Sequence, residues 1–258
     1  MTVESSAVTT EVSEGIATLT LNRPERLNAF NDALVRGALA FIEAARVDPA
    51  VKALVITGNG RGFCAGADLA GGLAPTGEGV NASMRDLFNP LILAIDEFPK
   101  PTVAAINGVA AGAGVGLALV CDIAVAARSA SFVLTFGPQL GLVPDLGVTW
   151  FLPRAIGRAR ARALALLGDK LPAETAAEWG LVWTCVDDAD CLPTARALAT
   201  RLGRGSAEAF FEIRRLMDRA ETSDLAAQLD AERETQIGLI VKPAFMEGVK
   251  NFLAKKAG

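Results

Sequence analysis

The chain has 258 residues, 51% of them hydrophobic, which is enough for one large domain with a substantial core and an appendage. A formal net charge of −4 gives no case for nucleic-acid binding, and the absence of histidine excludes every triad, general base or metal site that needs an imidazole. Tyrosine is also absent, so acid–base chemistry must come from carboxylates, lysine, cysteine, water or backbone groups.

The cysteines and the first residues indicate a cytoplasmic protein. Residues 1–15 are polar and acidic, without the pattern of a signal peptide. The cysteines form no C-x-x-C pair, and their spacing suits neither zinc nor a disulfide framework. We therefore expect no metal site, and free thiols at Cys64, Cys121, Cys185 and Cys191.

The first hundred residues alternate between strand and helix patterns. β-branched alternation around Glu14-Gly15 predicts a β-hairpin. Asn31 is a candidate N-cap for a helix that Pro49 ends. The expected elements are the hairpin strands 8–13 and 16–21, a polar loop 22–28, a buried strand 51–57, a flexible loop 58–62, a Gly/Pro-rich loop 70–81 and a helix 83–98.

A long uncharged stretch organises the chain. No charged residue occurs from Pro101 to Cys121, and residues 123–144 contain no Asp or Glu. We interpret it as a buried strand, a glycine-rich turn, a buried helix and a strand, followed by a loop that points Asp145 back at the turn. The first part is long enough to span a bilayer, but it is rich in Gly and Ala and carries Asn107 near its centre. Its glycines also lack the spacing of a dinucleotide-binding fingerprint.

The rest of the chain is mostly helical. Repeated strand–helix units up to about residue 190 indicate an α/β fold, with domain 1–195 as the core and 196–258 as a helical region. The last helices carry apolar faces that a small appendage cannot bury alone, so packing on the core or on another subunit is expected. The expected elements are a helix 151–167, a short helix 172–180, a strand 181–186, and helices 190–203, 206–220, 223–240 and 244–255, with Ser206 and Ser223 as candidate caps.

Five segments match one family pattern in order. They are RPERLNA (23–29), FCAGADL (63–69), KPTVAAINGVAAGAG (100–114), GLVPDLG (141–147) and EGVKNFLAK (247–255). Together they resemble the crotonase superfamily, also called the enoyl-CoA hydratase/isomerase family, over essentially the whole chain. Within it, the run from Leu142 to Trp183 is most similar to the branch of enoyl-CoA and 1,2-epoxyphenylacetyl-CoA isomerases.

This resemblance implies a spiral of ββα units, a C-terminal helical trimerisation region and an acyl-CoA thioester substrate. It implies a homotrimer or a dimer of trimers, and no cofactor beyond the coenzyme A of the substrate. It also implies an oxyanion hole formed by the backbone N–H groups of Ala67 and Ala113, where a glycine-rich turn presents donors to developing negative charge. The other residues expected to bind the substrate are Arg26, Ala29, Ala65, Asp68, Leu69, Met84, Phe88, Gly112, Gly114, Phe136 and Leu140.

The family pattern also bears on the reaction. Family hydratases hold a water between two glutamates, and the matching positions here are Gly116 and Gly137. Asp145 remains, where family isomerases carry a catalytic acid, and its apolar neighbours should raise its pKa. We hypothesise an enoyl-CoA or epoxyphenylacetyl-CoA isomerase. The alternatives are a hydratase or other crotonase chemistry, and a non-catalytic acyl-CoA binder.

Each singled-out residue also has a structural interpretation. Asp145 could cap the following helix, and Arg26 could be a solvated loop residue. Local capping of its loop is expected for Asp68, a structural hydrogen bond for Asp122, and a packed side chain for Cys64. Lys250 and Lys255 are weaker candidates for binding the CoA phosphates.

Overall fold

A six-stranded sheet forms the centre of the protein, whose computed structural model describes residues 6–70 and 76–256. The first two strands form the predicted antiparallel hairpin, and the other neighbours pair in parallel. Continuous buried apolar runs, such as ALVIT at residues 53–57, suit a parallel sheet that is covered on both faces. In sheet order the strands are β1 (Val8–Ser13), β2 (Ile16–Leu21), β3 (Ala53–Gly58), β5 (Thr102–Ile106), β7 (Ile123–Ala127) and β10 (Thr184–Val186).

A smaller sheet of four strands is built by the same repeat. The strands β3, β5 and β7 are each followed closely in the chain by a strand of this second sheet, and a helical segment comes next. This repetition is the predicted ββα spiral. The strands, in sheet order, are β4 (Gly62–Cys64), β6 (Val109–Ala111), β8 (Ser131–Val133) and β9 (Leu171–Pro172).

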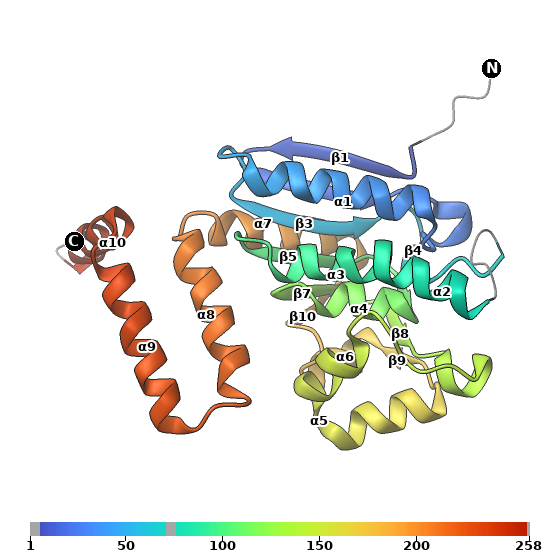
Figure 1. Cartoon of the computed structure of the whole chain (residues 1–258). Coiled ribbons are helices and arrows are strands. Elements are labelled where there is room, and N and C mark those ends of the chain that lie inside the picture. The colour runs from blue at the N-terminus through green and yellow to red at the C-terminus, as the bar shows by residue number, and fades with distance from the viewer. Residues whose placement is uncertain (1–5, 71–75, 257–258) are drawn as a thin grey trace.

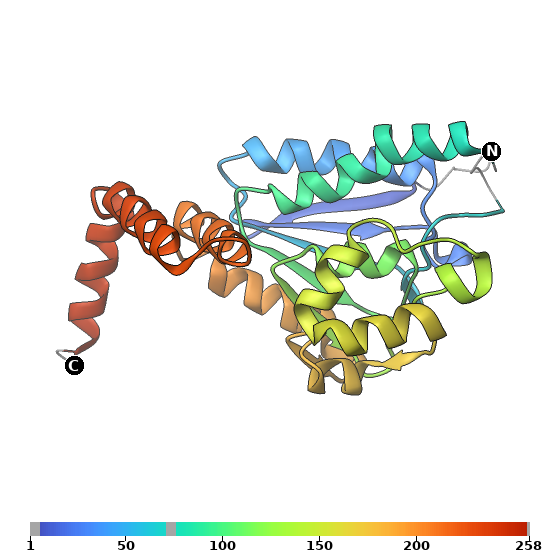
Figure 2. The same cartoon turned by 60° about the horizontal axis from the view of Figure 1, so that its bottom comes forward.

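Helices cover both faces of the larger sheet. Figure 2 shows α1 and α3 on one side of the strands and α7 on the other, where α7 packs on β3, β5 and β7. The Asn31 side chain accepts a hydrogen bond from the Leu34 N–H, which confirms the predicted N-cap. The helices of the body are α1 (Asp32–Val47), α2 (Gly77–Ser83), α3 (Asn89–Asp96), α4 (Ala113–Leu119), α5 (Val148–Leu167), α6 (Ala173–Glu178) and α7 (Cys191–Leu202).

Two local predictions were wrong. Residues from Gly77 onward are helical rather than loop, because the Thr76 hydroxyl caps the Gly79 N–H and a π-helical turn, Met84–Phe88, joins α2 to α3. Residues 71–75 of the expected loop lie outside the described residues. The second error concerns α9, where Asp224 rather than Ser223 is the N-cap, since its carboxylate accepts from the Ala227 N–H.

The last helices project from the body as an arm (Figure 1). The arm consists of α8 (Ala207–Ala220), α9 (Leu225–Ile240) and α10 (Pro243–Lys256), and Ser206 caps α8 as predicted. The predicted boundary between residues 195 and 196 falls inside α7, which packs on the sheet, so the projecting part begins after α7. Within residues 6–70 and 76–256 no helix is long and apolar enough to cross a bilayer. The exposed large apolar side chains of the arm are Ile213, Met217, Leu225, Leu229, Ile237, Ile240, Val241, Phe245, Met246, Val249, Phe252 and Leu253.

Candidate active site

Two backbone turns meet at the junction of the two sheets. One follows β4 at Gly66, and the other precedes α4 at Gly112. A Cβ atom at Gly66 would lie 2.9 Å from the Ala111 carbonyl oxygen and 3.2 Å from the Ala113 nitrogen. Gly66 also has a φ of +86°, which side chains rarely adopt. Glycine at 66 therefore lets the Ala67 turn approach the start of α4.

The turns carry two backbone donors with no partner. The Phe30 N–H donates to the Gly66 carbonyl at 2.7 Å, and the Asp68 N–H donates to the Phe30 carbonyl at 2.9 Å. The Ala67 N–H, which lies between these two residues in the chain, takes no part in this pairing. Ala113 is the first residue of α4, where an N–H has no intrahelical acceptor. Among the described residues neither N–H donates a hydrogen bond to the protein. Such a pair can stabilise an oxyanion.

Asp145 lies in the loop before α5. The side chain does not cap that helix: α5 begins without any side-chain cap, and only the Asp145 carbonyl accepts, from the Val148 N–H at 3.0 Å. The capping interpretation was therefore wrong. The Oδ1 atom is buried, and no described residue donates a hydrogen bond to it. Burial raises the pKa of Asp145 to about 6, and no charged side chain is among the causes.

The Asp145 loop packs along α4. A Cβ atom at Gly116 would lie 2.2 Å from the Leu146 carbonyl oxygen, and one at Gly112 would lie 3.6 Å from the Phe136 ring. Gly116 is three residues after Ala113, which is about 4.5 Å along a helix axis. Leu146, the residue after Asp145, therefore contacts α4 three residues beyond the unpaired Ala113 N–H.

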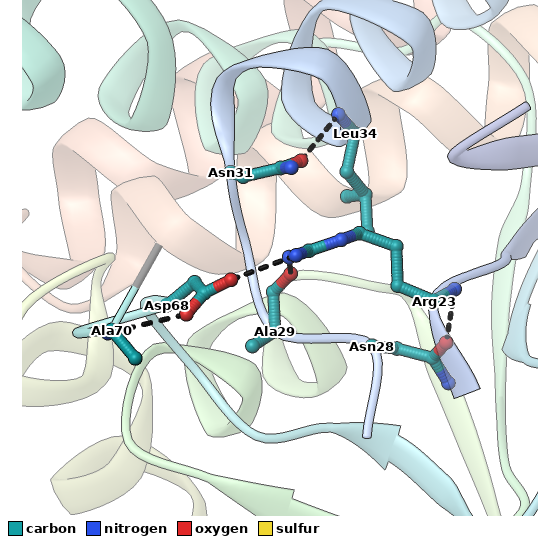
Figure 3. Close-up of polar contacts among 7 residues, drawn as sticks. All are labelled: Arg23, Asn28, Ala29, Asn31, Leu34, Asp68 and Ala70. Carbon is teal, nitrogen blue, oxygen red and sulfur yellow. Dashed lines mark hydrogen bonds and ion pairs between the residues drawn. The ribbon is translucent and has the colours of Figure 1, made fainter. Parts of the chain in front are cut away.

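An ion pair fixes the loop that carries Ala67 (Figure 3). The Arg23 guanidinium donates to the Asp68 carboxylate at 2.7 Å and to the Ala29 carbonyl at 2.6 Å, as Figure 3 shows. The Asp68 carboxylate also accepts from the Ala70 N–H, so the predicted capping role of Asp68 is confirmed. These hydrogen bonds hold the pKa of the Asp68 carboxyl below its usual value, and the hydrogen bond from Arg23 has the largest effect. Sequence reasoning missed Arg23, although it lies in the first family segment.

A buried amide supports the same loop from the other side. The Asn28 side chain is fully buried; it accepts from the Arg23 N–H and donates to the carbonyls of Asn59 and Gly62. Asn28 and Leu27 both have positive φ angles, of +58° and +49°. The hydrogen bonds of Asn28 thus hold this strained loop against β4.

The remaining predicted binding residues form two groups. Three are exposed: Arg26 in the 3-10 turn Pro24–Arg26, Leu69 and Leu140. The others are buried or half-buried, and the Phe88 ring packs on Phe30 with centroids 5.9 Å apart. This second group contains Ala29, Ala65, Met84, Phe88, Gly112, Gly114 and Phe136.

Two further structural interpretations are confirmed. The Asp122 carboxylate accepts from the Thr102 N–H at 2.7 Å and pairs with Arg214 of α8. The Cys64 side chain is fully buried, and burial raises the pKa of its thiol to about 12. Neither group lies free for catalysis.

A separate cavity of about 490 Å³ lies at the opposite end of α4, between the body and α8. Its walls include Trp150, Arg154, Trp183 and Asp218, and none of Ala67, Ala113 and Asp145. We therefore do not place the reaction in this cavity, because the unpaired N–H donors and the buried carboxylate lie elsewhere.

The ββα spiral and the two unpaired N–H groups beside each other are typical of the enoyl-CoA hydratase/isomerase family. The family model described as Enoyl-CoA hydratase/isomerase matches residues 11–257, and the chain belongs to this family. It is 46% identical over 253 residues to the 1,2-epoxyphenylacetyl-CoA isomerase of Escherichia coli K12, covering 97% of this chain and 96% of that protein. It is 44% identical over 248 residues to a Rhodobacter capsulatus protein named "Probable enoyl-CoA hydratase", covering 95% and 94%. The crystal structure of an enoyl-CoA hydratase from Bacillus anthracis matches with a TM-score of 0.90 at 29% identity, covering 96% of each chain.

Proposed function

We propose that the protein is an acyl-CoA isomerase that moves a double bond through a thioester enolate, with Asp145 as its acid–base group. The thioester oxygen accepts hydrogen bonds from the N–H groups of Ala67 and Ala113. The Asp145 carboxylate removes a proton from the α-carbon, and the electron pair moves onto that oxygen. The same carboxyl returns the proton at the γ-carbon, so no co-reactant, metal or nicotinamide is needed.

One observation carries this proposal: an oxygen of the Asp145 carboxylate is buried without a hydrogen-bond partner among the described residues, on a loop that contacts α4, the helix that begins with the unpaired Ala113 N–H. A pKa of about 6 leaves Asp145 ionised at neutral pH, yet makes it a stronger base than an ordinary carboxylate. A single base beside a stabilised enolate is what a double-bond shift needs.

Hydration is the second candidate, and similarity to relatives named as hydratases favours it. Against it, residues 123–144 contain no carboxylate, and the positions of the two hydratase acids are Gly116 and Gly137. Water addition to crotonyl-CoA above background would support hydration. Tight binding of CoA esters without turnover across a substrate panel would instead support a non-catalytic binder.

The acyl group of the substrate is proposed from the relatives and from the side chains near the two turns. Similarity to an epoxyphenylacetyl-CoA isomerase supports an aromatic acyl group, for which Asp145 assists ring expansion of an aryl epoxide. The rings of Phe30, Phe88 and Phe136 near the two turns are buried, with 1%, 5% and 6% exposure, and give the site apolar surroundings that suit such a ring. Exposed Arg26 is proposed to bind the CoA phosphates.

The arm is proposed to assemble the protein as a homotrimer or a dimer of trimers. Its exposed apolar side chains form a surface that a soluble monomer rarely leaves uncovered. Light scattering at micromolar concentration is the test, and a monomer would contradict the proposal. Truncation near Gly205 should give insoluble or misassembled protein.

Asp145→Asn tests the reaction. The variant keeps the shape of the side chain and removes the base, so isomerisation of a 3-enoyl-CoA to the conjugated 2-enoyl product should fall by about 10⁴-fold or more. Acyl-CoA affinity, measured in parallel, should change little because it rests on other groups. If the variant keeps more than about a tenth of the wild-type rate, well short of a general-base effect, Asp145 is not the base.

A further inference from the structure

Gly116 of α4 makes room for the backbone of the Asp145 loop. A Cβ atom at 116 would meet the Leu146 carbonyl oxygen at 2.2 Å and both the carbonyl carbon and the Cβ of Leu146 at 3.0 Å. A separation of 2.2 Å is far inside van der Waals contact, and the obstacle is backbone rather than the end of a flexible side chain. The loop can therefore take this path only where position 116 has no side chain.

The Leu146 backbone is held in a conformation that leucine disfavours. Its φ is +47°, in the left-handed region, whereas its side chain is buried in the core with 3% exposure. The next residue, Gly147, has a φ of +78° and leads directly into α5. The buried Leu146 side chain and the space left at Gly116 thus fix the backbone of Leu146 and the direction of the 146–147 peptide, to which the Leu146 carbonyl belongs.

We propose that Gly116 is a positioning residue for the reaction, because it makes room for the Leu146 carbonyl and so fixes the loop that keeps the Asp145 Oδ1 atom buried and without a partner among the described residues. This inference rests on the proposed function of Asp145. It has a corollary: a side chain at 116 and this placement of Asp145 exclude each other in the observed backbone.

A matched pair of glycine variants separates positioning from general damage to α4. A Cβ atom at Gly114 would lie 2.1 Å from the Cys64 carbonyl oxygen, a clash as severe as that at Gly116 but against β4 rather than the Asp145 loop. Gly116→Ala should lower kcat by about 100-fold, with KM changed far less. It should also move the acid limb of the pH–rate profile from near 6 toward the ordinary value for a carboxyl. Gly114→Ala should lower the rate without moving that limb.

A third glycine serves as the control. Gly77 is exposed, and a Cβ atom there would meet no atom within 4 Å, so Gly77→Ala should leave both kcat and the acid limb unchanged. An acid limb that stays near 6 in folded Gly116→Ala, or that moves equally in Gly114→Ala, overturns the inference.

A second route avoids the clash if Gly116→Ala does not fold. Leu146→Gly loosens the same loop without adding an atom, and it should lower kcat and shift the acid limb in the same direction. Leu152→Ala, which removes a buried leucine from α5, is the control for lost packing and should leave the limb in place. If the acid limb of the pH–rate profile is unchanged in Leu146→Gly, the inference is contradicted.

A direct titration separates this inference from the proposed function. The side-chain carboxyl of Asp145 can be followed by ¹³C NMR in the wild type and in each variant, with no substrate present. If Asp145→Asn keeps its activity while Gly116→Ala or Leu146→Gly still shifts the titration, the proposed function fails and the positioning of Asp145 stands. If neither variant shifts the titration, the inference fails whatever the activity shows.

Discussion

Replacing Asp145 by Asn should make the folded protein more stable at neutral pH, although it removes the base. The pKa of this carboxyl rises from 3.8 to about 6 because burial disfavours the charge, and its Oδ1 has no described hydrogen-bond partner. At 1.36 kcal/mol per pKa unit, the ionised carboxylate lowers the free energy of unfolding by about 3 kcal/mol at pH 7.

The expected gain is smaller than that figure. The side chain is only partly enclosed, and the Asn amide also loses hydrogen bonds to water, which costs about 1–3 kcal/mol if no partner replaces them. We expect a net stabilisation of about 1–2 kcal/mol, or roughly 2–8 °C in Tm for a chain of this size.

The stability difference between Asp145→Asn and the wild type should depend on pH. Below pH 3.8 the carboxyl is protonated in both the folded and the unfolded state, so the penalty is absent. The penalty grows as pH rises, because the folded state holds its proton longer, and it is complete above pH about 6. Thermal melts of both proteins at equal concentration should therefore differ more at pH 7.5 than at pH 4.5.

A matched change at an exposed site provides the control. Asp169 is exposed, so Asp169→Asn should alter the free energy of unfolding by less than about 0.5 kcal/mol at either pH. An Asp145→Asn protein that is less stable than the wild type at pH 7.5, or a difference that is the same at both pH values, would refute the reasoning.

Four further predictions concern the site and its supports. The rate kcat/KM should fall about tenfold per pH unit below pH about 6, and a profile flat to pH 5 would contradict Asp145 as the base. Arg23→Gln leaves the Asp68 carboxylate without its cation and should lower the free energy of unfolding in urea by about 3 kcal/mol; a loss below about 1 kcal/mol would assign the pair little structural role. Asn31→Ala removes the N-cap of α1 and should cost about 1 kcal/mol by the same assay, whereas an unchanged midpoint would contradict the cap. Arg26→Gln should raise KM with kcat unchanged, and an unaltered KM would leave Arg26 a solvated loop residue.

The sequence was sufficient wherever one local pattern decided the structure. Alternation around Glu14-Gly15 predicted the hairpin, and Asn31 before an apolar helical period predicted the start of α1. The family segments indicated which backbone turns would meet, and Asp145 stood out because its surroundings contain no other acid.

What the sequence did not predict depends on contacts between distant segments. Arg23 and Asp68 are 45 residues apart, and neither sequence motif indicates that the loops carrying them face each other. The helix that begins at Gly77 lacks an apolar period in its first turns, so only the Thr76 cap could have indicated it. The left-handed φ of Leu146 is imposed by its buried side chain and by the space at Gly116, and local propensity argues against it.

The position of the arm after both sheets in the chain bears on the order of synthesis. Helices α8–α10 begin at Ala207, so both sheets and the site are encoded entirely before them. At about 5–20 residues per second, the last 52 residues, 207–258, take roughly 3–10 s to translate, which is long compared with the folding of strand–helix units already released. The exposed apolar side chains of the arm therefore emerge from the ribosome after both sheets, when the body that must carry them has had time to fold.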